Sequence, residues 1–254
     1  NSRVTLEFCS SPYIPNITGN VKGVLELLRE IKLNPVNGRY KSILELNEDE
    51  MSKLVTAIIL RNPKTKNEEL VGDIFLIKMF NKLEDARELS AVINACSRYG
   101  ETEISIKFCL EIPKAKEKAE TIHAKYKQLL ISGLKFASET EKIHGKDFVI
   151  INAKNNIKDT MAGTITSILS NSSIYEEGTI ITTMAYYNDK IKISSRTAGK
   201  NGRNVREILA KIIDQIGGEV GGHEFAAGAM ISREKEKQFI EELKKNLEIQ
   251  VVKI

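Results

Sequence analysis

The chain has 254 residues, of which 41% are hydrophobic and 28% charged, and its formal net charge is +4 at pH 7. This composition is typical of a globular protein with one or two domains. The three widely separated cysteines argue against a disulfide framework or a zinc site, and no apolar run is long enough to span a membrane. With no visible signal peptide, we expect a cytoplasmic protein that makes no membrane contact.

Residues 1–112 are predicted to form a mainly helical α+β region that serves in partner interaction. Alternating apolar and polar residues at 3–9 predict a strand, and the apolar run at 74–80 fits either a strand or a buried helix. Residues 103–112 form a short apolar segment. Apolar residues at helical spacing predict helices at 20–31, 48–61 and 83–97, the last of them ended by Gly100.

Residues 114–142 contain no proline and one glycine, and their pattern predicts one long helix. We expect this helix, within a segment 113–145, to connect two parts of the chain.

Residues 146–254 are predicted to form an α/β domain with a mixed sheet and flanking helices. The expected strands are 148–151, 179–185, 190–194, 226–231 and 249–254. The expected helices are 159–169, 204–216 and 232–247. Asn188-Asp189 marks a turn between two of the strands.

Five glycines and His223 lie within residues 217–229, between a predicted helix and a predicted strand. Such a cluster fits a phosphate cradle built from bare backbone amides, but a plain glycine-rich turn fits it equally well. The loop at 195–204 follows a strand and carries Arg196, Lys200 and Arg203 among hydroxyls and glycines. That composition favours contact with a phosphate backbone over a solvated loop without function.

Catalytic motifs are absent from the sequence. It has no paired aspartates and histidines for a two-metal centre, no Walker loop and no nucleophile elbow, and its three histidines are isolated. The sequence therefore predicts a chain that binds a ligand and does not itself cut it.

Two motifs in the C-terminal part carry a family resemblance. Ser194-Ser195-Arg196 at a strand end, followed by Gly221-Gly222-His223 and Ala226-Ala227-Gly228-Ala229, resembles the DHHA1 domain of the DHH phosphoesterase superfamily. Residues 83–100, with 13–19 before them, further resemble the archaeal RecJ-like branch, which includes a GINS-associated nuclease. The resemblance implies phosphate contacts from six residues, namely Ser194, Ser195, Arg196, Gly221, Gly222 and His223. Lys200 and Arg203 of the basic loop extend this predicted site.

Family enzymes hold their metal ligands in an N-terminal DHH domain, and its Asp-His-His motif is absent from this sequence. The chain also begins at Asn1 without a methionine, which fits a fragment of a longer protein. We therefore expect no cofactor in this chain, with Mn²⁺ or Mg²⁺ required only where a DHH domain precedes it.

The resemblance favours single-stranded DNA or RNA binding, with GINS and the replicative helicase as further partners. The alternative is the substrate-binding half of a Mn²⁺-dependent, single-strand-specific 5'-3' exonuclease. A third interpretation is a relative that takes short nucleotides or cyclic dinucleotides.

Overall fold

The computed structural model describes residues 2–9, 12–63, 70, 72–73, 75–199 and 201–248. The chain divides into two compact units, one formed by Asn1–Thr65 with Gly133–Ile254 and the other by Lys66–Ser132. Within the described residues, no helix is long and apolar enough to cross a membrane.

The N-terminal part is helical. It contains α1 (Ser2–Glu7), α2 (Val21–Glu30), a short 3₁₀ turn η1 (Ile43–Glu45) and α3 (Glu48–Arg61). Asn20 caps α2, because its side chain accepts a hydrogen bond from the Gly23 amide.

The strand predicted at residues 3–9 is wrong, because this segment forms α1. Ser2 and Leu6 are both buried and lie four residues apart, and Arg3 pairs with Glu7 at 3.1 Å. Both spacings belong to one face of a helix. In so short a segment, alternation of apolar and polar residues does not separate the two periodicities.

The unit of residues 66–132 contains a hairpin of β1 (Leu76–Met79) and β2 (Lys82–Asp85), followed by α5 (Ala86–Tyr99) and α6 (Thr102–Cys109). The helix predicted from residue 83 therefore starts three residues later, where Asp85 caps it by accepting from the Arg87 amide. Gly100 ends it in the left-handed conformation, as expected. The hydrophobic core of this unit includes Leu89, Cys96 and Phe108.

The long helix predicted at 114–142 is confirmed as α7 (Ala115–Glu139). Beyond it lies the mixed sheet that was expected at the C-terminal end, with strands in the order β3-β4-β5-β6-β8-β7. Among these described strands, only β4 and β5 pair in parallel. The strands are β3 (Ile143–Gly145), β4 (Phe148–Lys154), β5 (Ile180–Tyr187), β6 (Lys190–Thr197), β7 (Glu219–His223) and β8 (Ala226–Ser232).

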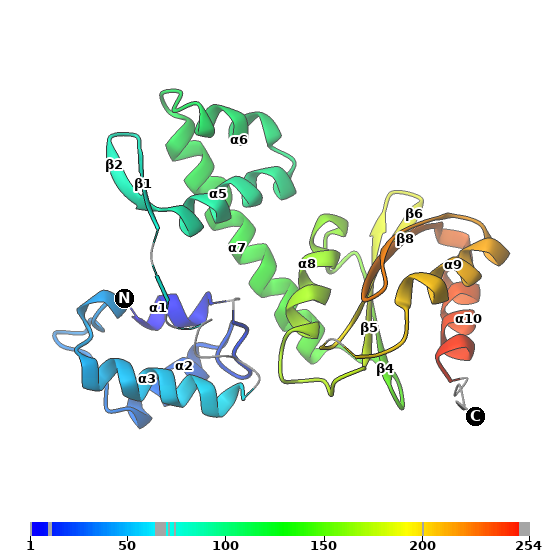
Figure 1. Ribbon diagram of the computed structural model, residues 1–254, viewed down its shortest axis with the longest axis horizontal. Helices are drawn as coiled ribbons and strands as arrows, with labels where there is room; N and C mark the ends of the chain where they lie inside the picture. The colour runs from blue at the N-terminus through cyan, green and yellow to red at the C-terminus, as the bar shows by residue number, and fades with distance from the viewer. Residues whose placement is uncertain are drawn as a thin grey trace. The chain divides into compact units, whose positions relative to one another are not determined.

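Helices cover the two faces of this sheet unequally (Figure 1). α8 (Asp159–Ser170) packs on β5 and β6 from one side, whereas α9 (Val205–Ile216) and α10 (Glu236–Glu248) pack on the other. The main core lies on the α9/α10 side, where Ile191, Ile193 and Ala229 meet residues such as Leu209 and Phe239. Because side chains alternate along a strand, the residues between these core positions face the α8 side.

Three further predictions in this part differ from the structure or lie outside it. The glycine-rich stretch contains strand β7, which no sequence pattern predicted. The helix predicted at 232–247 opens with a 3₁₀ turn, η2 (Arg233–Lys235), before α10 begins. The strand predicted at 249–254 lies outside the described residues.

Candidate nucleic-acid interface

Four of the predicted site residues meet on the α8 side of the sheet. Across the strands, Arg196 of β6 lies opposite Ala226 of β8, and Ala226 lies opposite His223 of β7. In the next row of the same face, Ser194 is followed by Gly228 and then by Gly221. We call these six residues the outer strip.

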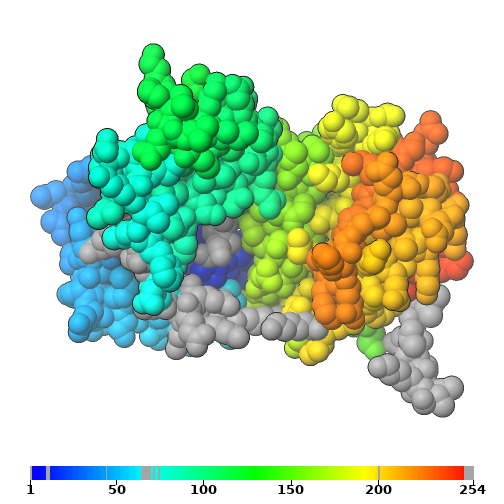
Figure 2. Space-filling view, turned by 45° about the horizontal axis from the view of Figure 1, so that its top comes forward, coloured from blue at the N-terminus to red at the C-terminus, as the bar shows by residue number. Residues whose placement is uncertain are grey.

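The outer strip is poor in side chains between its two polar edges. Neighbouring strands lie about 4.8 Å apart, so β6 and β7 are separated by about 10 Å. Ala226 and Gly228, which occupy the strand between them, leave that space almost bare. α8 packs on β5 and β6, and the β7–β8 hairpin lies open at the surface (orange in Figure 2), with Gly221 and His223 exposed.

Gly221 and Gly222 are glycines for different reasons. A Cβ added to Gly222, whose φ is +126°, would lie 2.4 Å from the carbonyl oxygen of Ala226, so the hairpin itself requires this glycine. A Cβ added to Gly221 would meet nothing within 4 Å. The packing of the described residues therefore does not explain why position 221 lacks a side chain, and its bare backbone is open to a ligand.

Ser194 sits at the inner margin of the outer strip, beneath α8. Its side chain is nearly buried, and a Cβ added to Gly163 of α8 would lie 3.8 Å from its Oγ. Opposite it on β5, the buried Thr183 has an Oγ1 without a hydrogen-bond partner among the described residues. The strip therefore has the Ser194 hydroxyl at its β6 edge, with the buried Thr183 beside it, and the Arg196 side chain at one end.

The structure places Ser195 on the other face of the sheet. It is 1% exposed, and its Oγ shares a 2.7 Å hydrogen bond with the hydroxyl of Thr182. Gly222 also faces the α9/α10 side, because it lies opposite Ala227. These two residues shape the sheet, and neither presents a side chain to the outer strip.

Arg203 is directed toward the end of α10. Its guanidinium donates hydrogen bonds of 3.1 and 2.7 Å to the carbonyl oxygens of Asn246 and Leu247. Burial lowers the pKa of Arg203 below its ordinary value. This contact satisfies carbonyl groups in the last turn of a helix, which have no partner inside the helix.

The basic loop between β6 and α9 is tied down by its neighbours. The Asn201 amide donates to the Glu177 carboxylate at 3.1 Å, and the backbone amides of Gly178 and Ala198 donate to carbonyls across the loop. Lys200, which the sequence singled out, lies outside the described residues. A carboxylate beside this loop weakens its attraction for phosphate, so the outer strip is the stronger candidate.

Sequence reasoning placed Lys192 on the basic surface beside the loop without including it among the site residues, and it missed Thr183. Lys192 lies on the α8 side of β6 with Ser194 and Arg196, and its ammonium is 3.9 Å from the Asp159 carboxylate at the start of α8. Alternation along 190–197 is the signal that could have placed Lys192 on the same face as Ser194 and Arg196. Thr183 belongs to an apolar strand and becomes relevant only through its pairing with Ser194.

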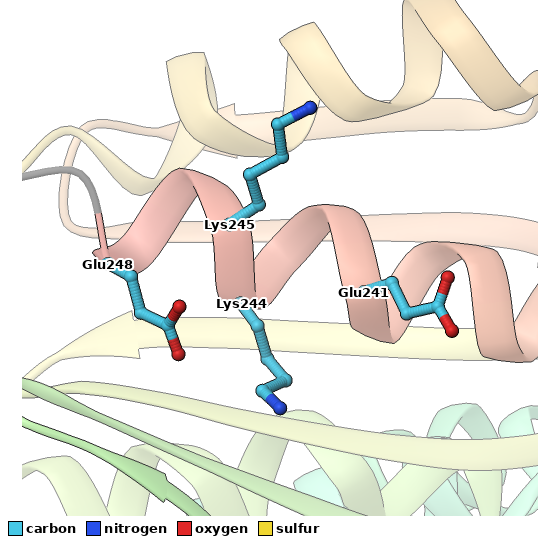
Figure 3. Close-up of a pocket in the computed structure, with 4 residues that line it drawn as sticks. All are labelled: Glu241, Lys244, Lys245 and Glu248. Atoms are coloured by element: carbon cyan, nitrogen blue, oxygen red, sulfur yellow. The ribbon is translucent and has the colours of Figure 1, made fainter.

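A separate hollow lies on α10, lined by Glu241, Lys244, Lys245 and Glu248 (Figure 3). Its two acids and two bases cancel in charge, all four residues belong to one helix, and the side chains diverge in Figure 3. This hollow has no feature that selects an anionic ligand. Among the described residues, no group of three or more His, Cys, Asp or Glu side chains is placed to hold a metal ion.

Comparison with protein families gives two matches along the chain. Residues 145–248 match the family model of the DHHA1 domain, and residues 3–70 match that of the DHH-CID domain. The C-terminal part of the chain is a DHHA1 domain. The outer strip lies wholly within the DHHA1 domain, and the two matches together support the DHH superfamily.

Individual relatives extend the comparison. An uncharacterized protein of Methanocaldococcus jannaschii is 30% identical over 244 residues, covering 92% of this chain and 49% of the relative. The chain thus spans about half the length of the curated relative that it matches. CDC45 from Entamoeba histolytica is similar in fold, with a TM-score of 0.56 and 10% identity over 89% of this chain and 50% of that one. RecJ from Thermus thermophilus, at 18% identity over 89% of this chain and 34% of that one, has a TM-score of 0.49.

Proposed function

We propose that the DHHA1 domain binds single-stranded nucleic acid, DNA in particular, through the outer strip. One observation carries the proposal: Arg196 and His223 lie in one row across the sheet, with only Ala226 between them. The exposed backbone of Gly221 lies in the next row. The match to the DHHA1 family model and the CDC45-like fold support a role with nucleic acid.

Each part of the outer strip has a chemical task in this proposal. Arg196 neutralises a phosphate and releases its counterion, while the His223 imidazole donates a hydrogen bond to a phosphate oxygen or a terminal nucleotide. The bare backbone at Gly221 lets the nucleic-acid strand approach the sheet closely. Backbone contacts of this kind position a strand without reading its sequence, so we expect little sequence preference.

The test is the salt dependence of binding. A labelled 20-nucleotide single strand is titrated with the chain at several salt concentrations, and fluorescence anisotropy gives the affinity. We expect affinity to fall steeply as salt rises. Arg196→Gln should weaken binding and reduce the slope of log affinity against log salt by about 0.7, the loss of one phosphate contact.

Lys211→Gln is the matched control. Lys211 is exposed in the middle of α9, which covers the opposite face of the sheet, so the variant loses one positive charge away from the outer strip. It should retain both the affinity and the slope of the wild-type chain. An equal loss in the two variants would show that binding follows net charge, and would reject the outer strip as the site.

A second candidate follows from the length of the relative. Because the chain matches 49% of its M. jannaschii relative, the outer strip can serve as the substrate-gripping part of a larger single-strand-specific 5'-3' exonuclease. Its metal centre, with Mn²⁺ or Mg²⁺, would then belong to a separate DHH domain. The longer relative should degrade single strands when Mn²⁺ is added, whereas this chain should bind them intact. Absence of cleavage by the relative would favour a dedicated binding protein.

We also propose that the 66–132 unit contacts a protein of the replication machinery, GINS or the replicative helicase. Leu76 and Leu83 face the same side of the β1–β2 hairpin and are 57% and 67% exposed. Exposed apolar residues of this kind mark many protein interaction sites.

A further inference from the structure

The α8-facing side of β6 carries a row of polar residues that extends past the outer strip. Reading back from Arg196, every second residue faces this side, namely Ser194, Lys192 and Lys190. Two strand residues span about 6.7 Å, so the row covers about 20 Å. Two peptide units and one nucleotide have the same number of backbone bonds. The spacing between side chains of the row is therefore about the length of one nucleotide in an extended single-stranded nucleic acid.

Apart from Ser194, the row is accessible along the margin of α8. The Lys192 side chain is 41% exposed, and Lys190 is exposed. The 3.9 Å separation between Lys192 and Asp159 is long for an ion pair, so a phosphate can compete for the ammonium. The nearly buried Ser194 contributes only a hydroxyl edge at its own position.

The charged residues of the edge strand β7 favour a path of the nucleic acid along β6. In the row that contains Lys192, β8 contributes Met230 and β7 contributes the exposed Glu219. Glu219 repels phosphate from the sheet edge at this level, whereas at the level of Arg196 the edge carries His223. A nucleic-acid strand whose end is bound between Arg196 and His223 is therefore attracted toward the lysines of β6.

An aromatic ring stands at the far end of this path. Tyr187 of β5 pairs with Lys190 of β6, faces the same side of the sheet, and is 48% exposed. An exposed tyrosine beside phosphate-binding lysines can stack a base. The turn that follows, with Asn188 in the left-handed conformation, ends the hairpin there.

We propose that the ligand of the DHHA1 domain is an oligonucleotide of about four nucleotides or more, laid along β6 from Arg196 to Lys190 with a base stacked on Tyr187. This inference rests on the proposed function and specifies its substrate class. A mononucleotide or dinucleotide reaches only the outer strip, whereas a longer strand also reaches Lys192, Lys190 and Tyr187.

The test compares deoxythymidine oligonucleotides of two, four and eight nucleotides, bound to the full chain at low salt. Affinity should rise clearly from two to four nucleotides. Tyr187→Leu should weaken binding of the eight-nucleotide strand about tenfold and leave the dinucleotide unchanged. Tyr187→Phe, which keeps the ring, should bind as the wild type does. The double variant Lys190→Gln/Lys192→Gln should reduce the salt slope for the longer strand by about 1.4.

The possible failures are distinct. If Arg196→Gln weakens binding of all lengths while the Tyr187 and lysine variants bind the eight-nucleotide strand normally, the path along β6 is rejected and the outer strip remains. If the wild-type chain binds none of the strands, the proposed function itself is rejected. Unfolding temperatures equal to that of the wild type show that each variant is folded.

Discussion

Neighbouring residues of one motif serve different purposes in this domain. Gly221 and Gly222 are adjacent in sequence, yet the hairpin requires only Gly222 to lack a side chain. Likewise, Ser194 faces the α8 side, whereas Ser195 is buried against Thr182 on the other. Alternation along the strands divides each motif into one residue that can contact a ligand and one that supports the sheet.

This division predicts opposite results for two glycine variants. Gly222→Ala should lower the free energy of unfolding by more than about 1 kcal/mol, because its Cβ would overlap the Ala226 carbonyl in a backbone conformation suited to glycine. Gly221→Ala should change it by less than about 0.5 kcal/mol, because its Cβ enters open space. Urea unfolding measures both variants.

A substitution at Gly221 can test the effect of a side chain on binding separately from its effect on stability. Gly221→Val should leave the unfolding free energy close to that of the wild type but weaken single-strand binding, because the branched side chain occupies the floor of the outer strip. If the folded Gly221→Val variant binds single strands as the wild-type chain does, the proposal that the ligand backbone lies close to this residue is wrong.

At the scale of elements, the sequence predicted regular structure best where its pattern was long. The 25-residue α7 and the sheet strands at 148–154, 180–187 and 190–197 correspond to predicted segments. The six-residue α1 was mistaken for a strand, and β7 was mistaken for a loop. β7 has three exposed residues in succession and two glycines, so it depends on its pairing with β8 and leaves no hydrophobic pattern.

The candidate site was predictable in part for the same reason. The motifs indicated Arg196, Gly221 and His223, and strand pairing places all three on one face. Arg203 was included because the loop is basic, but its guanidinium contacts the end of α10. Local charge does not reveal a partner more than forty residues away along the chain.

The long helix α7 carries a residue whose ionisation couples to stability. Burial, together with the nearby Lys127, lowers the pKa of His123 below its ordinary value, against a smaller opposing effect of Glu88. The unfolded chain therefore takes up a proton near pH 6.5, where the folded chain does not. Stability is full above that pH and is lost as the pH falls toward the pKa of the folded state.

His123→Gln should remove this part of the acid sensitivity. The drop in unfolding temperature between pH 7.5 and pH 5 should be smaller in the variant than in the wild-type chain, because glutamine does not titrate. Differential scanning calorimetry at the two pH values measures both drops. Equal drops would show that His123 contributes nothing to the pH dependence.

At the scale of the whole molecule, the two compact units suit a division of tasks. The DHHA1 domain holds the outer strip, and the 66–132 unit exposes apolar residues on its β1–β2 hairpin. We propose the first as a surface for nucleic acid and the second as a surface for protein. Loss of binding through the outer strip should therefore leave protein contacts of the 66–132 unit unchanged.

Hydrogen–deuterium exchange in the presence of a single-stranded oligonucleotide tests the nucleic-acid interface most directly. As the edge strand, β7 points every second backbone amide away from β8, and these amides exchange with solvent in the free chain. Our account predicts that a saturating 20-nucleotide strand slows exchange at residues 219–223 and leaves the peptides of α9 and α10 unchanged. Unchanged exchange in β7, with the oligonucleotide demonstrably bound, would contradict it.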